Sequence, residues 1–174
     1  MTNNEVQAIF NEAISMCSAA GYKPQKLCPI CKINSRKKAY AICKEGRNRW
    51  TGEVVSTEIG VSKYFVAKAN KQQMLETLVH ECLHSAVGAK QGHKGQWKIA
   101  ADKVSRLYGL DIERTSNYKD EQGNGILSNE QNAKYILKCP KCGKKFYFNR
   151  MSKTVKFPSI FQHTPCKVDL IRIK

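Results

Sequence analysis

The sequence has few acidic residues, and it shows neither a long apolar run nor the pattern of a secretory leader. It has 14 Asp and Glu against 30 Lys and Arg, a formal net charge of +16. No stretch approaches the roughly 20 apolar residues of a membrane span. Residues 1–13 lack the basic and apolar regions of a signal peptide. These absences argue against a membrane protein or a secreted one, and we expect a cytoplasmic protein, compatible with the nucleoid.

That compartment decides how the cysteines are interpreted. Eight cysteines in an intracellular protein are more often metal ligands or buried thiols than disulfides. A length of 174 residues suits one domain with or without a small appendage. An apolar content of 41% argues against global disorder.

The positive charge is concentrated in two blocks. Residues 21–50 hold nine basic side chains against one acidic, and residues 138–174 hold ten against one. Residues 51–137 nearly cancel, with eleven against ten. Such blocks indicate an anionic partner, usually nucleic acid or a membrane surface, although solvated lysine-rich surfaces also occur without one.

The order of elements predicts an α+β fold. Apolar periodicity after a Thr2-x-x-Glu5 capping box predicts a helix over residues 4–20, and residues 31–62 favour two or three strands. Helices are predicted over residues 70–87 and 95–108. The expected core face of the last helix is Trp97, Ala100, Ala101, Val104 and Leu107. We place a first domain at residues 1–115, a linker at 116–133 and a small β domain at 134–174.

The third predicted helix carries a His-Glu-x-x-His motif. His80 and His84 are one helical turn apart and lie opposite the apolar stripe of that helix. His93 follows a turn that contains Gly88 and Gly92, and it is the expected third ligand. Three imidazoles would hold a catalytic Zn²⁺ with one open position for water.

Glu81 lies beside the first of these ligands in the sequence. Zinc lowers the pKa of a bound water to about 7, and Glu81 is placed to accept its proton as a general base. The gap between His84 and His93 is longer than the metzincin pattern allows.

A second set of metal ligands is expected near the C-terminus. Cys139 and Cys142 form one Cys-x-x-Cys knuckle, and His163 and Cys166 form another at the same spacing. This layout is typical of a zinc ribbon, in which a closed four-ligand ion is structural. Cys28, Cys31 and Cys43 leave two alternatives open, a third metal site or simple thiols.

Together these residues resemble the SprT-like family of zinc metalloproteases. The resemblance rests on "LVHECLHSAVG", on "GHKGQW", on the strand-like "INSRKKAYAICK" and on the C-terminal knuckles. Two positions depart from the family pattern: Lys94, where Gly is frequent, and His163, where Cys is frequent. The resemblance implies a minimal zincin-like domain followed by a zinc ribbon.

The resemblance also implies a function. Relatives include proteases that digest proteins crosslinked to DNA, so we expect a monomeric zinc endopeptidase that acts on DNA-bound proteins, on single-stranded or junction-containing DNA. The alternative is a nucleic-acid-binding or regulatory zinc protein with little or no peptidase activity. The expected DNA contacts come from the two basic blocks: Arg36, Lys37, Lys38, Lys144, Lys145 and Arg150.

Overall fold

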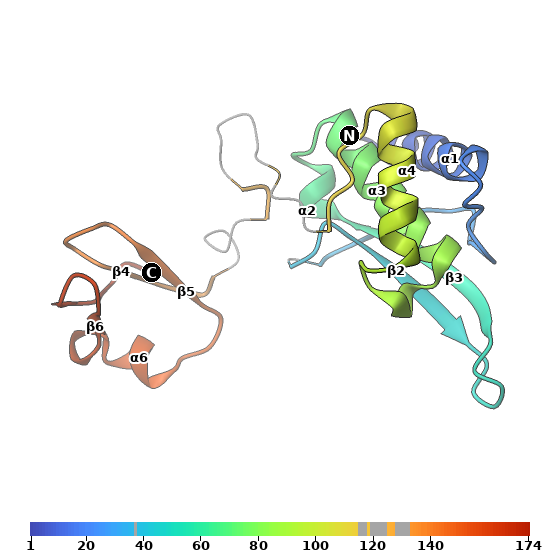
Figure 1. Cartoon of the computed structure of the whole chain (residues 1–174). Coiled ribbons are helices and arrows are strands. Elements are labelled where there is room, and N and C mark those ends of the chain that lie inside the picture. The colour runs from blue at the N-terminus through green and yellow to red at the C-terminus, as the bar shows by residue number, and fades with distance from the viewer. Residues whose placement is uncertain (37, 115–117, 119–124, 128–132) are drawn as a thin grey trace. The chain divides into compact units, whose positions relative to one another are not determined.

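The computed structural model describes residues 1–36, 38–114, 118, 125–127 and 133–174 (Figure 1). The chain forms two compact units, Met1–Ile126 and Leu127–Lys174, and each is described by itself. Lys37 and most of the expected linker at residues 116–133 lie outside the described residues. In the described parts of the chain, every helix is too short or too polar to cross a membrane.

Side-chain caps define the starts of two main helices of the first unit. α1 (Asn3–Ala19) begins with the predicted capping box, in which Thr2 and Glu5 bond each other's backbone N–H groups. α3 (Lys71–Val87) begins with an equivalent box from Asn70 and Gln73. Such boxes satisfy N–H groups that have no partner inside the helix.

The other helices of this unit are α2 (Lys63–Val66), the 3-10 turn η1 (Ala89–Gln91) and α4 (Gln96–Tyr108). α4 ends at the predicted residue, Tyr108, where the following Gly109 adopts a left-handed conformation. The short segments α2 and η1 leave no periodic signal and were not predicted.

The first unit also contains a three-stranded sheet of order β1-β3-β2. β1 (Lys32–Asn34) is parallel to β3 (Val54–Ser62), and β2 (Ala41–Arg47) is antiparallel to it. β2 and β3 form a long hairpin that projects beyond the helices in Figure 1. β2 is an edge strand of this sheet, so among the described residues one side of its backbone is not paired with another strand.

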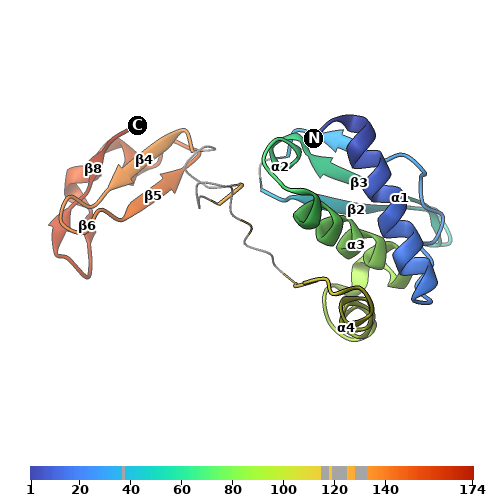
Figure 2. The ribbon, with the colours of Figure 1, turned by 90° about the horizontal axis from the view of Figure 1, so that it is seen from above.

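The core of the first unit lies around α3. α1 and α3 run side by side in Figure 2, and α3 also contacts β2, β3 and α4. Phe10, Phe65, Met74 and Trp97 are among its fully buried side chains. Leu107 was predicted to belong to this core, but 57% of it is exposed. The prediction fails because the residue lies in the last turn of α4, at the margin of the apolar stripe.

The second unit is a small β structure. Its three-stranded sheet has the order β5-β4-β8, from β4 (Tyr135–Lys138), β5 (Lys145–Phe148) and β8 (Ile171–Arg172). A second hairpin pairs β6 (Gln162–His163) with β7 (Val168–Asp169). Along the chain, β5 and β6 are separated by a helical turn, α6 (Lys153–Lys156), and by the 3-10 turn η2 (Pro158–Ile160).

The buried core of this second unit is very small. Leu137, Cys139 and Leu170 form its centre, with Phe146 and Phe161 packed against them. A core of this size is too small to stabilise a β unit without further support, and such units are commonly stapled by a metal ion. The α+β class that the sequence predicts is therefore observed, with all of the long helices in the first unit.

Candidate metal centre and its surroundings

The two histidines of α3 lie on the side of the helix that faces α4. Leu75, Leu78 and Cys82 form the apolar stripe on the other side and are buried. Trp97, at the start of α4, packs over the histidine side with its ring centroid 4.6 Å from that of His80 and 5.3 Å from that of His84. His84 is consequently buried and His80 partly so. α3 is therefore covered on both faces, not only along its apolar stripe.

The loop after α3 brings the third histidine to the same place. Gly88 and Gly92 have φ angles of 99° and 63°, which residues other than Gly rarely adopt. The chain reverses through them, and the three Nε2 atoms converge: 3.2 Å for His84–His80, 3.1 Å for His84–His93 and 2.9 Å for His93–His80. The sequence-predicted ligand trio is thus gathered at one point.

The electrostatics of this trio suit a cation. Burial and the neighbouring histidines lower the pKa of His80 to about 3, and burial with His93 lowers that of His84 to about 4. Burial lowers the pKa of His93 as well. All three rings are therefore neutral at pH 7, the form in which imidazole binds metal ions.

One ring orientation is fixed by the segment that follows α4. Nδ1 of His80 lies 3.0 Å from the carbonyl oxygen of Glu113, which can only accept a hydrogen bond. The neutral His80 ring must then carry its proton on Nδ1 and direct the lone pair of Nε2 toward the other histidines. This arrangement is typical of metal-binding histidines, so these residues fit a zinc ion.

Two buried nitrogens of the centre lack a hydrogen-bond partner among the described residues. They are Nδ1 of His84 and Nε1 of Trp97. The two rings are stacked, with an interplanar angle of 25°. Trp97 was predicted as a core residue and belongs to the "GHKGQW" segment of the resemblance. Its ring centroid also lies 4.7 Å from that of His93, so the indole contacts all three histidines.

Glu81 lies on the side of α3 that faces the sheet. It is 9% exposed, and burial raises the pKa of its carboxyl to about 7, against a backbone hydrogen bond from Cys43 on β2 that lowers it. A carboxyl with a pKa near 7 exchanges its proton readily at neutral pH. The edge strand β2 is therefore in direct contact with the candidate base.

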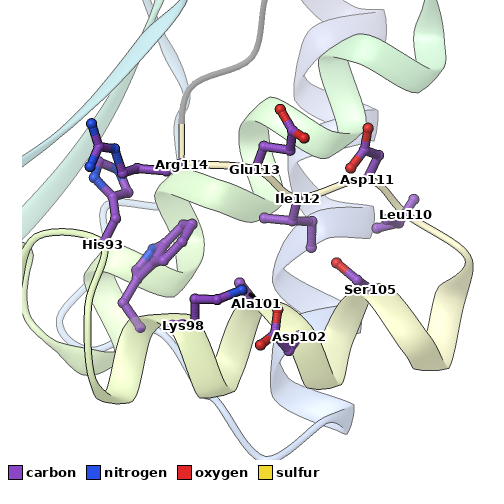
Figure 3. Close-up of a pocket in the computed structure, with 11 residues that line it drawn as sticks. His93, Lys98, Ala101, Asp102, Ser105, Leu110, Asp111, Ile112, Glu113 and Arg114 are labelled. Atoms are coloured by element: carbon purple, nitrogen blue, oxygen red, sulfur yellow. Dashed lines mark hydrogen bonds and ion pairs between the residues drawn. The ribbon is translucent and has the colours of Figure 1, made fainter.

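A groove of about 730 Å³ opens beside His93 and Trp97. It runs between α4 and the segment 110–114, which faces α4 in Figure 3. Ala101, Leu110 and Ile112 supply apolar surface, and an ion pair of 2.9 Å between Lys98 and Asp102 lies on the α4 side. The groove thus offers mixed apolar and charged surface next to the third histidine.

The four expected ligands of the second unit also come together. Cys139 and Cys142 lie in the turn between β4 and β5, where Gly143 donates its N–H to the carbonyl of Cys139. In the other hairpin, Cys166 donates its N–H to the carbonyl of His163. The ligand atoms of all four lie within 4.8 Å of one another, with Sγ of Cys142 3.4 Å from Nδ1 of His163.

Cys28, Cys31 and Cys43 do not join either group. Among the described residues, which include every cysteine, the candidate metal groups are the two already given. Burial raises the pKa of Cys31 and of Cys43 to about 12, so both stay protonated at neutral pH. Because the three side chains are not gathered into a group of ligands, the geometry favours the interpretation as simple thiols.

The residues predicted to contact DNA lie on both units. Arg36 and Lys38 on the first unit are exposed, as are Lys144 and Arg150 on the second, whereas Lys145 is partly buried. Lys37 lies outside the described residues.

Three residues near the centre or on the hairpin beside it were missed in the sequence. Glu45 and Glu76 each accept a hydrogen bond from a backbone N–H far away in the chain, so no spacing reveals this role. Trp50 is a lone aromatic among arginines, and this was a signal available in the sequence.

Comparison with known families places this geometry in context. A model of the SprT-like family matches residues 14–116, which is more than half of the chain and includes α3, the histidine loop and α4. The chain belongs to the SprT-like family. The resemblance seen in the sequence is thereby confirmed, and with it the zincin-like character of the first unit. No curated protein matches the chain. The SprT-like match ends before the second unit.

Proposed function

We propose that this SprT-like protein is a zinc-dependent endopeptidase that acts on proteins bound or crosslinked to DNA. One observation carries the proposal: three neutral imidazoles whose Nε2 atoms lie within 3.2 Å of one another, on a helix that also carries the buried Glu81. Family membership supports a metalloprotease-like or DNA-associated function, and the two clusters are compatible with zinc.

His80, His84 and His93 would hold the catalytic ion. When bound, Zn²⁺ supplies an acidified water and polarises the carbonyl of a peptide bond. Glu81 is the general base, because its pKa of about 7 lets it take a proton from the water and pass it to the leaving amine. Glu113 keeps His80 in the tautomer that ligation requires.

The surroundings suit a polypeptide substrate. The unpaired side of β2 lies next to Glu81 and is able to hydrogen-bond an extended chain. The groove beside His93 has room for a substrate side chain, with apolar surface and both charges available. We therefore propose that substrates bind as extended segments between β2 and this groove.

The second unit would act as a structural zinc ribbon with a nucleic-acid surface. Cys139, Cys142, His163 and Cys166 form a closed set with no position for water. Phe157 is 46% exposed and carries Lys156 over its ring at 5.2 Å. Aromatic rings beside cations are what single-stranded nucleic acids bind.

The test uses the full chain loaded with zinc and a protein crosslinked to DNA. We expect DNA-dependent cleavage by the wild type and a loss of at least about 100-fold in Glu81→Gln, the usual range for a general base. Glu81→Gln should retain its zinc and its DNA affinity. Glu58→Gln is the matched control, since Glu58 is a partly exposed carboxylate on β3, outside the histidine centre, and its partner is Lys32.

The contrary result is equally definite. A zinc-loaded wild type that binds DNA but cleaves neither bound protein nor itself would favour a nucleic-acid-binding or regulatory role. The charge and the ribbon serve such a role equally well.

A further inference from the structure

The tip of the β2–β3 hairpin carries the most exposed large apolar side chain of the described residues. Trp50 is 90% exposed, whereas the only other tryptophan, Trp97, is 1% exposed. Tryptophan is on average among the more buried residue types because its ring carries a large apolar surface. An indole in this position contributes almost nothing to the stability of the fold.

The backbone beneath Trp50 is nevertheless held by several hydrogen bonds. The side-chain oxygen of Asn48 accepts hydrogen bonds from the N–H groups of Trp50 at 2.8 Å and Thr51 at 3.1 Å. Gly52 donates to the carbonyl of Asn48 at 2.9 Å, and Arg47 Nη1 donates to the carbonyl of Gly52 at 2.8 Å. The turn therefore holds a fixed shape and presents the indole to solvent at a defined place.

The charge around the tip is positive. Arg49 precedes the indole, is exposed and has no ion-pair partner among the described residues. Lys26 lies beside the first residue of β3, directly after the turn, with Nζ 2.5 Å from the carbonyl oxygen of Val54. The buried Glu45 is neutralised by Arg47, which leaves Glu53 as the exposed acid of the turn.

We propose that this hairpin tip is a binding site for single-stranded nucleic acid, in which the indole of Trp50 stacks on a base while Arg49 and Lys26 contact phosphates. An exposed aromatic ring beside cations is the arrangement that accepts an unpaired base, whatever its sequence. A protein partner would require a larger apolar patch on the hairpin, but among its described residues Val55 is the only other large apolar side chain that is exposed.

The position of the tip connects it to the candidate active site. The tip is carried by β2, and a few residues earlier on the same strand Cys43 bonds to Glu81. A nucleic acid held at the tip would keep an attached protein close to the edge of β2. The inference extends the proposed function, because it assumes the DNA association proposed there.

The experiment measures binding of an oligothymidylate of about 16 nucleotides to the zinc-loaded full chain, with Glu81→Gln present to prevent cleavage. Trp50→Ala should weaken binding by roughly 5- to 150-fold, which corresponds to the loss of one stacked base. Trp50→Phe, which keeps a ring, should retain most of the affinity. Arg49→Gln should lower the slope of log affinity against log salt by about one phosphate contact, whereas Trp50→Ala should leave the slope unchanged.

Intrinsic fluorescence gives a second readout. The oligonucleotide should quench the solvent-exposed emission of Trp50 and leave that of buried Trp97 nearly constant. Arg106→Gln removes the same charge from α4 and is the matched control for Arg49→Gln. Wild-type affinity in Trp50→Ala, or binding of protein but not oligonucleotide at the tip, would overturn the inference while leaving the proposed protease intact. A chain that binds no DNA at all would overturn the DNA association itself.

Discussion

The carboxylate of Glu45 on β2 accepts a hydrogen bond of 2.6 Å from the backbone N–H of Ala89, the first residue of η1. Glu45 is held in turn by Arg47, and its side chain is only 6% exposed. Ala89 lies in the loop that carries His93 from the end of α3 to the candidate metal centre. The sheet thus fixes the starting point of the segment that supplies the third imidazole.

We predict that Glu45→Ala lowers zinc affinity at the histidine centre by about 10- to 100-fold, the usual effect of losing a residue that orients a ligand. Competition with a chromophoric chelator measures it. Glu45→Gln keeps an acceptor for Ala89 and should lose less, and Glu58→Ala on the same sheet should lose nothing. Equal affinities in all four proteins would show that η1 positions His93 without help from the sheet.

Metal analysis of the purified full chain should give two zinc ions. His84→Ala should reduce the count to one, because it removes a ligand of the histidine centre, and Cys139→Ser should reduce it to one by opening the closed cluster. Cys28→Ser is the control and should retain both ions. A wild-type count of three would revive a site at Cys28, Cys31 and Cys43, and a count of one would remove the ribbon ion.

The metal-free first unit should lose stability in acid. Folding lowers the pKa of His80 to about 3 and that of His84 to about 4, from the ordinary histidine value of 6.5. Below pH 6.5 the unfolded chain therefore binds more protons at these two residues than the folded chain does. Stability contributed by these neutral rings is complete above pH 6.5 and falls as the pH decreases toward 4. Glu81 acts in the opposite sense, because its raised pKa favours the folded state below pH 4.5 and that contribution is lost toward pH 7.

The two histidines outweigh the one carboxyl, so the melting temperature of the metal-free protein should fall from pH 6.5 to pH 4. Glu81→Gln should steepen this fall, because it removes the opposing proton equilibrium. Thermal melts at a series of pH values, followed by the emission of Trp97, provide the measurement. A melting temperature that is constant or rises over this interval would contradict the burial of the histidines.

Glu76 provides a fourth test, because it fixes the segment after α4. Its carboxylate, on α3, accepts hydrogen bonds from the backbone N–H of Asp111 at 3.2 Å and from the hydroxyl of Tyr118 at 3.0 Å. Two residues after Asp111, the carbonyl oxygen of Glu113 bonds to His80. Glu76→Ala should lower the free energy of unfolding by about 1–3 kcal/mol, the cost of a buried donor without its acceptor.

The same change should speed zinc release, since the support of Glu113 is weakened. Glu76→Gln retains an acceptor oxygen, so its unfolding free energy and its rate of zinc release should lie between those of the wild type and Glu76→Ala. Chemical denaturation and the rate of zinc transfer to a chelator measure the two effects. If only the unfolding free energy changes, Glu76 supports the fold and not the ligand.

What could be predicted from the sequence was mainly local. The capping box at Thr2, the helices near residues 70–87 and 95–108 and the turn through Gly88 each depend on residues a few positions apart, and the structure shows all of them. The histidine trio could be recognised for the same reason. The two cysteine knuckles were visible as fixed spacings.

The rest depended on contacts between distant residues. Glu45 and Ala89 are 44 positions apart, and Glu76 and Asp111 are 35 apart, so no local sequence pattern predicts either contact. The exposure of Leu107 reflects where the neighbouring helices stop, which the periodicity of α4 alone does not contain. The raised pKa of Glu81 could not be predicted from the sequence either, because it arises from burial against β2.

The ring of Trp97 lies within 5.3 Å of all three histidine rings, measured between centroids. An indole at this distance from a coordination site is an optical probe that the protein already contains. In a Trp50→Phe chain it is the only tryptophan, so its emission reports on one site alone. Replacing zinc with a paramagnetic ion such as Co²⁺ should quench that emission, and the occupancy of the centre could then be followed in real time during turnover.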